Sequence, residues 1–417
     1  RDTNAEVIRM VDQHEKDVQL LRERMEGDYQ RYRLTPFTPI DEVTGSSLTG
    51  YAAYTSSDPR AFANKVIAWL TQARVLIRVK HTNDRQHDAK ADNLKESLAI
   101  GLLNSADERL GRLLHPQLQG ALAFYVSIRG GFIGGRCLLV KREDGSTYVD
   151  ITPWDPMNTH FGVGADGLDW ACYKIKKTPQ QIQNEYGVTL GDASKATDGT
   201  TDAEVQGVYV YDFYDAETNR VITEKETLKA PTRHGASRVP CYMTLVGNTP
   251  VIQTIGTTGV IADVGESIYE SVRQVYDKYN NIMSIFLELT ARARKQALLV
   301  YSRDGKKELP EDPHLAGTEI SLSNDEKIEV LKLLEMAKDT NEFMQLIEGE
   351  MQRGTIPFAS YGQLAFQLSG YAINSLRQGI ETVLVTRLDA MKQIYLQIVN
   401  LLYDQYLSGF FDPMELS

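Results

Sequence analysis

The sequence of 417 residues contains little cysteine and little histidine. Its three cysteines, Cys137, Cys172 and Cys241, lie far apart and form no CxxC pair. A disulfide framework or a thiolate zinc site needs closely spaced cysteines, so the sequence predicts neither and indicates synthesis in a reducing cytoplasm. The seven histidines are scattered without HExxH or a similar ligand spacing, so we expect no metal site and no cofactor.

Long apolar runs and an excess of positive charge are also missing. No stretch approaches the roughly 20 apolar residues that span a bilayer, and no secretory signal is visible, so we expect no membrane partner. The 45 basic and 56 acidic residues give a net charge of −11. Such a surface should not bind duplex DNA tightly, because tight binding needs clustered Lys and Arg that neutralise phosphates. The first residue is Arg1 rather than Met, so we expect a trimmed portion of a longer chain.

Motifs of catalysis are absent too. There is no GxSxG, and no cysteine lies in a recognisable nucleophile context. The glycines of RGGFIGGR (129–136) follow a predicted helix and precede a predicted strand, without Lys-Ser/Thr. A phosphate-binding loop has the opposite order, so these glycines favour a helix C-cap and a tight turn. Asp150 and Asp155 are interpreted as turn and cap residues, and Trp154 as a packed side chain, so we expect no enzyme.

The first two thirds of the chain predict an α+β unit in which helices precede antiparallel strands. Residues 1–33 have helical periodicity among many charges, typical of a solvated helix or of one docked on a neighbouring subunit. Further helices are expected over 58–79 and 88–128, the second broken near Pro116. The strand-rich part follows, with a hairpin turning at Asp144-Gly145, a short helix over 178–187, a polar loop over 191–204, a second hairpin over 208–228 and a strand over 239–248.

The last third is almost wholly helical. Apolar residues at steps of three and four predict one helix over 265–294, about 45 Å long. An insertion with two short strands follows, and helix returns over 331–353 with an acidic exposed face. A final helix after Ser369 runs to about Leu407, with Gly379 as a kink point. A small domain cannot bury helices this long, so we expect lateral packing against other subunits.

Between the last two predicted helices lies MQRGTIPFASYGQLAFQLSGYAIN (351–374). Its glycines and Pro357 break the helix, because proline removes a backbone donor and glycine permits positive φ. Aromatic residues surround these breakers. The segment predicts a short hinge loop whose aromatic side chains either project outward or pack into a neighbouring subunit.

Basic residues gather near the insertion, at Arg292, Arg294, Lys295, Arg303, Lys306 and Lys307. They suit contact with DNA or with an acidic partner. They also suit ordinary roles, as charges that complement a helix C-terminus or as a solvated turn, and for a single residue the ordinary role is the commoner one.

The order of these elements, with four local sequences, resembles the portal proteins of tailed bacteriophages. VGESIYESVRQVYDKYNNIMSIF (264–286) is similar to the entry into that family's first stem helix, and QLSGYAINSLRQ (367–378) to the start of its long helix. VSIRGGFIGGRCLLVKRE (126–143) and TPWDPMNTHF (152–161) are similar to segments of its body. The order and spacing of these degenerate motifs carry the resemblance, which covers about 61–417.

The resemblance implies an α+β, mainly α portal fold that assembles as a ring. Its parts would be a wing over 1–262 with an N-terminal helix over 1–33, a first stem helix over 263–294, a clip over 295–333, a second stem helix over 334–353, a tunnel loop over 354–368 and a long kinked helix over 369–417 that returns to the wing and crown.

Proteins of this family form dodecameric rings at one capsid vertex and pass double-stranded DNA during packaging and ejection. The resemblance therefore implies a non-enzymatic virion protein, assembled in the host cytoplasm and located at the portal vertex. Its implied partners are further copies of itself, the terminase large subunit, tail adaptor or connector proteins, major capsid and scaffolding proteins, and non-specific duplex DNA.

The resemblance also implies site residues, none of them catalytic or metal-binding. The tunnel-loop residues that would face DNA are Gly354, Thr355, Pro357, Phe358, Ser360, Tyr361 and Gln363. The clip residues that would dock terminase and then adaptors are Arg303, Asp304, Lys306 and Lys307. The stem residues that would line the channel are Glu335, Asp339 and Glu342.

Two other classes of function stay open. One is another ring-forming head–tail connector or structural virion protein. The other is an enzyme such as a nuclease, with a site built from carboxylates far apart in the sequence.

Overall fold

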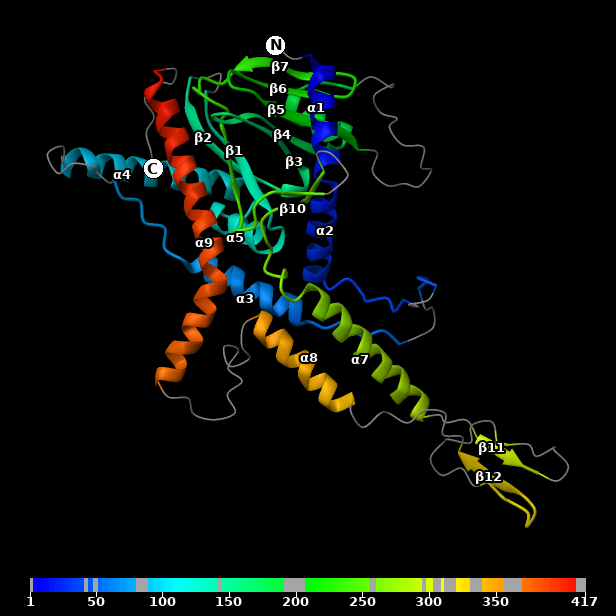
Figure 1. Ribbon diagram of the computed structural model, residues 1–417. Helices are drawn as coiled ribbons and strands as arrows, with labels where there is room; N and C mark the ends of the chain where they lie inside the picture. Colours follow the sequence, from blue (N-terminus) through cyan, green and yellow to red (C-terminus); the bar gives the residue numbers. More distant parts are fainter. Residues whose placement is uncertain are drawn as a thin grey trace. The chain divides into compact units, whose positions relative to one another are not determined.

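The computed structural model describes residues 3–40, 44–47, 52–79, 89–141, 145–190, 207–254, 260–294, 298–302, 309–310, 320–330, 340–355 and 370–409. The chain divides into two compact units. Unit 1 comprises Arg1–Gln30, Ala63–Glu270 and Ser369–Ser417, and unit 2 comprises Arg31–Phe62 and Ser271–Leu368. Both units contain helices and antiparallel strands, so the expected mixture of α and β structure, compatible with an α+β class, is confirmed (Figure 1).

Unit 1 is built around two antiparallel sheets. In the smaller one, β1 (Phe132–Lys141) lies between β2 (Thr147–Trp154) and β8 (Cys241–Leu245), giving the order β2-β1-β8. The larger sheet is a meander of β3 (Thr159–Gly164), β4 (Gly167–Lys177), β5 (Val208–Tyr214), β6 (Thr218–Thr223) and β7 (Thr227–Arg233). A short pair, β9 (Ile252–Gln253) and β10 (Ile261–Asp263), lies beside them. The two predicted hairpins and the strand over 239–248 are therefore confirmed.

The helices that accompany these sheets are α1 (Asn4–Asp17), α2 (Gln19–Arg33), α3 (Asp58–Gln72), α4 (Ala89–Arg112), α5 (Leu118–Ile128), α6 (Pro179–Tyr186) and α9 (Gly370–Leu407) (Figure 1). Of these, α1, α4, α5 and α9 pack on strands of the two sheets. The break near Pro116 and the short helix over 178–187 agree with the sequence. The 38 residues of α9 run unbroken through Gly379, and its second half buries Met391, Ile394 and Ile398 in unit 1, where α9 contacts β1, β8 and α5.

The N-terminal helical region differs from the expectation of one charged helix facing solvent or a neighbouring subunit. It forms two helices that meet at Val18. Thr3 caps the first of them through a reciprocal pair of hydrogen bonds with Glu6. Val7 and Val11 are fully buried against residues of the larger sheet. The valines of α1 lie on one face of the helix, and the larger sheet of the same chain covers that face.

Two of the four glycines of the RGGFIGGR segment, Gly130 and Gly131, act as the C-cap interpretation predicts, whereas Gly134 and Gly135 lie within β1. Gly130 and Gly131 follow α5 with φ values of 60° and 68°, the left-handed region that favours glycine. A Cβ atom on residue 135 would lie 2.3 Å from the Thr152 carbonyl oxygen of the neighbouring strand. These glycines turn the chain from helix to strand and let β1 approach β2 closely.

Three parts of the predicted structure need correction. The helix expected over 58–79 ends at Gln72, and residues 73–79 are not helical. The hairpin of β3 and β4 was not anticipated, although the Gly164–Gly167 turn between them is visible in the sequence. The helix expected over 265–294 begins only at Arg273. Gly265 has a φ of 61°, and Ser267 is tied into unit 1 by a 2.6 Å hydrogen bond to Asp28 and a 2.8 Å bond from Arg387 to its carbonyl. These ties hold 265–272 in turns despite its helical spacing.

Unit 2 contains α7 (Arg273–Arg294), α8 (Thr340–Gly354) and the antiparallel pair β11 (Leu298–Tyr301) and β12 (Lys327–Val330). The two short strands expected in the insertion are therefore confirmed. The helices α7 and α8 contact each other. Residues 331–339, at the start of the expected second helix, lie outside the described residues.

Candidate functional site

Most of the site residues implied by the resemblance lie outside the described residues. These are the clip residues Arg303, Asp304, Lys306 and Lys307, the loop residues Pro357, Phe358, Ser360, Tyr361 and Gln363, and the stem residues Glu335 and Asp339. Glu342 is described and is exposed in the first turn of α8. Gly354 and Thr355 are described at the other end of that helix. Of the implied site residues, the structure therefore describes only Glu342 in the first turn of α8 and Gly354 and Thr355 at its end.

The C-terminal end of α8 contacts the segment that leads into α7. The Ser271 hydroxyl donates a hydrogen bond to the Gly354 carbonyl at 2.9 Å. A Cβ atom on residue 354 would lie 2.2 Å from Val272 Cγ1, so this approach needs glycine. The backbone N–H and the hydroxyl of Thr355 both donate to the Met351 carbonyl, at 3.0 and 2.7 Å. The exit of the chain from α8 is thus fixed at Gly354 and Thr355.

A polar stripe on α7 holds an extended segment of the chain. The backbone N–H groups of Ser56, Tyr54 and Ala52 donate to Asn280 at 2.9 Å, to Ser284 at 2.9 Å and to Glu288 at 3.3 Å, respectively. Two extended residues span about 6.6 Å and four helical residues rise about 6 Å, so the two repeats match. We call these three contacts the polar ladder. It fixes residues 52–56 along one face of α7.

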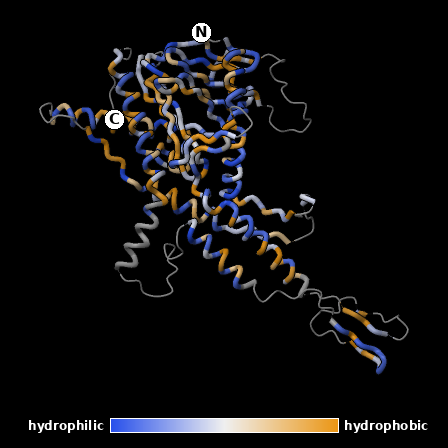
Figure 2. The backbone as a smooth tube through the Cα atoms, viewed as in Figure 1, coloured by the Kyte–Doolittle hydropathy of each residue, from blue (hydrophilic) through white to orange (hydrophobic). Residues whose placement is uncertain are grey.

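Large apolar side chains remain exposed on both helices of unit 2, and Figure 2 shows apolar residues recurring among polar ones along α7 and α8. On α7, Ile285 and Leu287 are 52% and 41% exposed, and on α8, Phe343 and Leu346 are 52% and 64% exposed. An apolar stripe on a helix stabilises the protein only when another element covers it. Among the described residues, both helices of the pair therefore keep large apolar side chains exposed.

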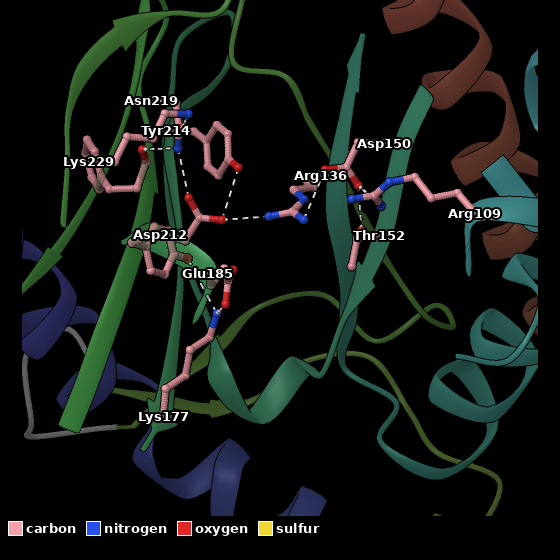
Figure 3. Close-up of polar contacts among 12 residues, drawn as sticks. Arg109, Arg136, Asp150, Thr152, Lys177, Glu185, Asp212, Tyr214, Asn219 and Lys229 are labelled. Atoms are coloured by element: carbon pink, nitrogen blue, oxygen red, sulfur yellow. Dashed lines mark hydrogen bonds and ion pairs between the residues drawn. The ribbon is translucent and has the colours of Figure 1, made fainter. Parts of the chain in front are cut away.

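Unit 1 holds a buried cluster of charged residues between its two larger sheets (Figure 3). Asp150 on β2 accepts hydrogen bonds from Arg109 and from Thr152, both at 2.8 Å. Arg136 on β1 pairs with Asp150 at 3.0 Å and reaches across to Asp212 on β5 at 3.0 Å. Asp150 thus lies within a strand as an ion-pair partner, and its interpretation as a turn or cap residue is wrong. The interpretation failed because the charged partners of Asp150 are distant from it in the sequence.

The larger sheet completes this cluster. Asp212 also accepts from Tyr214 at 3.0 Å and from Asn219 at 2.8 Å, and Lys229 donates to Asn219 at 2.6 Å. Burial opposes the charge on Arg136, but Tyr214 and the two carboxylates raise its pKa well above the ordinary value. Each carboxylate oxygen of the cluster has a partner. The cluster therefore fastens the two sheets together.

Asp155 and Trp154 behave as the sequence predicts. Asp155 caps the short 3-10 helix Pro156–Asn158 through a 3.1 Å hydrogen bond from the Met157 N–H. Its carboxylate also pairs with Arg129, with two contacts of 3.1 Å. Trp154 is 1% exposed and stacks on Tyr173 at a ring distance of 5.3 Å.

Two histidines meet where α1 packs on the larger sheet. Their Nδ1 atoms, on His14 and His160, lie 3.2 Å apart, and His160 Nε2 is buried without a hydrogen-bond partner. A buried acceptor is left unpaired more readily than a buried N–H, so we assign the Nδ1 proton to His160, which donates it to His14. Burial lowers the pKa of His14 to about 4. Burial, with the His14 charge second, lowers the pKa of His160 to about 3.

In the part of the chain that the structure describes, no three or more His, Cys, Asp and Glu residues gather in a way that could hold a metal ion. Within the same residues, no helix combines the length and the apolar character that crossing a membrane requires. No model of a known protein family matches the chain, and no curated protein sequence matches it.

Sequence reasoning missed the polar ladder and the buried cluster. A signal for the ladder exists, because Asn280, Ser284 and Glu288 recur every four residues along the predicted helix and therefore share one face. The cluster leaves no such signal. Its carboxylates Asp150 and Asp212 lie 62 positions apart (212 − 150 = 62).

Proposed function

We propose that this chain is a portal protein of tailed bacteriophages, the subunit of a ring at one capsid vertex through which double-stranded DNA is packaged and ejected. The order of elements supports the proposal: an α+β unit leads into α7, a two-stranded insertion, α8 and the long helix α9. The observation that carries it is the exposed apolar surface on α7 and α8. Neighbouring copies in a ring would cover that surface.

The charge of the chain suits a channel that lets DNA slide. Twelve copies at −11 carry a formal charge of about −130. Each phosphate that a protein neutralises adds salt-sensitive affinity, so acidic walls with sparse basic contacts keep the duplex mobile. Glu342, with Glu335 and Asp339, would contribute to such a wall. The isolated oligomer is expected to bind duplex DNA weakly, and tight, salt-sensitive binding would contradict this mechanism.

In this proposal the segment after Gly354 contacts the DNA. The helix α8 ends at Gly354, and Phe358, Ser360, Tyr361 and Gln363 would face the duplex. Replacing both Phe358 and Tyr361 with Ala should leave ring assembly intact and impair packaging or genome retention. Normal packaging and retention by the double variant would count against a tunnel-loop role.

The clip is the proposed docking surface for the terminase large subunit and then for tail adaptors. A charge reversal of Arg303, Lys306 and Lys307 to Glu should weaken terminase-driven packaging while rings still form. The matched control reverses Lys16, Lys95 and Lys392, three exposed lysines outside the clip, and should leave packaging unchanged. Equal packaging by the clip variant and the unmodified protein would contradict this assignment.

Negative-stain images of the purified chain test the proposal most directly. A ring of about twelve subunits with an axial hole is expected. Portal and head–tail connector rings are then distinguished by whether the ring stimulates DNA packaging. A monomer or dimer would instead favour an enzyme with a site spread along the sequence.

A further inference from the structure

An open apolar groove lies within unit 1 beside β8, with a volume of about 740 Å³. Apolar side chains on its lining are unusually exposed: Val163 is 67% exposed, Leu245 43% and Val251 52%. The exposed carboxylate of Asp166 lies on the same lining. A groove of this size accommodates several side chains, and exposed apolar surface of this kind marks a binding site.

A second exposed apolar feature ends α4. All residues from 111 to 117 are exposed, and within them Leu113 and Leu114 are 51% and 94% exposed. The N–H of His115 donates to the Leu110 carbonyl at 2.9 Å, which is the hydrogen bond of a helix C-cap whose left-handed residue is usually glycine. Here that residue is Leu114, with a φ of 59°. We call Leu113 and Leu114 the leucine knob.

The leucine knob has no local reason for its form. Glycine would adopt the φ of Leu114 without strain, and a polar side chain would be better hydrated at 94% exposure. Backbone strain that is retained in this way points to a role outside the local structure. Burial of the exposed Leu114 side chain against an apolar partner in a complex is such a role.

The strands β2 and β8 are the two edges of the sheet β2-β1-β8; the leucine knob follows α4, which contacts β2, and the groove is lined by β8. The helix α4 contacts β2, and Arg109, near its end, pairs with Asp150 of that strand. The groove is lined by β8, including Met243 and Leu245. Because the sheet separates them, a chain cannot fill its own groove with its own knob. A second copy can.

The charges around the two features are complementary. Arg112 is exposed directly before the leucine knob, and Asp166 is exposed on the groove. Arg238 also lines the groove, but its charge is offset by an ion pair with Asp404 at 2.8 Å. Opposite charges at the edge of an apolar contact steer the two surfaces into one orientation. This pairing favours a second copy of the chain over an unrelated apolar ligand.

We propose that the leucine knob of one copy inserts into the apolar groove of the next copy. The knob and the groove are different surfaces, so the contact is head-to-tail and closes into a ring when the rotation per copy divides a full turn. The inference rests on the proposed ring and specifies where the first units of neighbouring copies meet.

A disulfide cross-link tests this contact in the full chain. The three native cysteines are buried and unpaired, so they should not compete with cysteines placed at Leu114→Cys and Val163→Cys. After mild oxidation, the double variant should give a ladder of dimers, trimers and larger species on a non-reducing gel. Each single variant should stay uncross-linked. A dimer from the Leu114→Cys variant alone would show a symmetric contact and overturn the proposal.

The same experiment separates this inference from the proposed function. Rings without a ladder would overturn the knob-and-groove contact and leave the portal proposal standing. A ladder without closed rings would support the contact and contradict the portal. If neither a ladder nor rings form, both proposals are refuted.

A glycine substitution tests the leucine knob without endangering the fold. Leu114→Gly removes the side chain and relieves the positive φ, so the free chain should be at least as thermally stable as the unmodified protein. Its assembly should nevertheless weaken at least tenfold. Leu407→Gly, at another highly exposed leucine (78%) on α9, is the control and should assemble normally. Unchanged assembly of the Leu114→Gly variant would contradict the proposal.

Discussion

Lowering the pH from 7 to 5 should destabilise unit 1 through the pair His14 and His160. Burial keeps both imidazoles neutral in the folded protein, with pKa values of about 4 and about 3. In the unfolded chain both pKa values return to about 6.5. The unfolded state therefore binds more protons between these limits, so stability is full above pH 6.5 and falls as the pH drops toward 4.

The size of the effect follows from the unfolded state. At pH 5 both folded histidines are still neutral, and each unfolded histidine gains about 2 kcal/mol from protonation relative to pH 7. The pair should therefore cost about 4 kcal/mol of unfolding free energy. Glu15, whose pKa is lowered to about 2 by Lys174 and Arg22 against the effect of burial, adds little here, because its contribution is lost only below about pH 4.5.

Urea unfolding at half-unit pH steps from 7 to 5 measures this loss. All three tryptophans, Trp69, Trp154 and Trp170, lie in unit 1, so their fluorescence reports this unit. For the wild type, the slope of unfolding free energy against pH should correspond to an uptake of nearly two protons on unfolding near pH 5.5. A double variant, His14→Gln with His160→Gln, should lose most of that slope even if its absolute stability is lower.

A third histidine, His234, limits how much of the pH dependence of the unfolding free energy the double variant can lose. The pKa of His234 is also lowered by burial, so a residual slope of the same sign should remain. The reasoning about the pair is refuted if the wild type and the double variant have the same slope between pH 7 and 5.

Three substitutions test the other packing features. Asp150→Asn leaves Arg109 and Arg136 without their shared carboxylate and should cost about 3–5 kcal/mol of unfolding free energy by urea titration. The exposed Asp169→Asn should cost less than about 0.5 kcal/mol, and equal losses would contradict the role of the cluster. Gly135→Ala puts a Cβ atom against the Thr152 carbonyl and should cost about 1–3 kcal/mol, whereas Gly111→Ala, with open space around it, should be neutral or stabilising by up to about 1 kcal/mol. Ser284→Ala removes the acceptor of the Tyr54 N–H and should lower the protection of that amide from hydrogen exchange by about 1–3 kcal/mol, and unchanged protection would argue against the polar ladder.

Local patterns in the sequence were sufficient to predict much of the secondary structure of unit 1. The glycines at 130 and 131 marked the turn from helix to strand, and the strand runs around Gly145 marked the first hairpin. Both signals are local, because a φ angle or an alternating face depends on neighbouring residues. The helix start was misplaced at 265 because Ser267 and Gly265 are held by contacts with residues far along the chain.

The candidate site was less accessible to sequence reasoning. The partners of Asp150, and the pairing of 52–56 with α7, depend on which elements the fold brings together, and single-sequence periodicity carries no such information. The docking of α1 on its own sheet was missed for the same reason. Val7 and Val11 gave the buried face but did not identify what covers it.

The oligomeric state of the isolated chain tests the central claim most directly. Negative-stain imaging combined with a mass measurement in solution should show closed rings of about twelve copies with an axial hole, as the proposed portal function implies. A stable monomer or dimer at the same concentration would contradict the portal assignment.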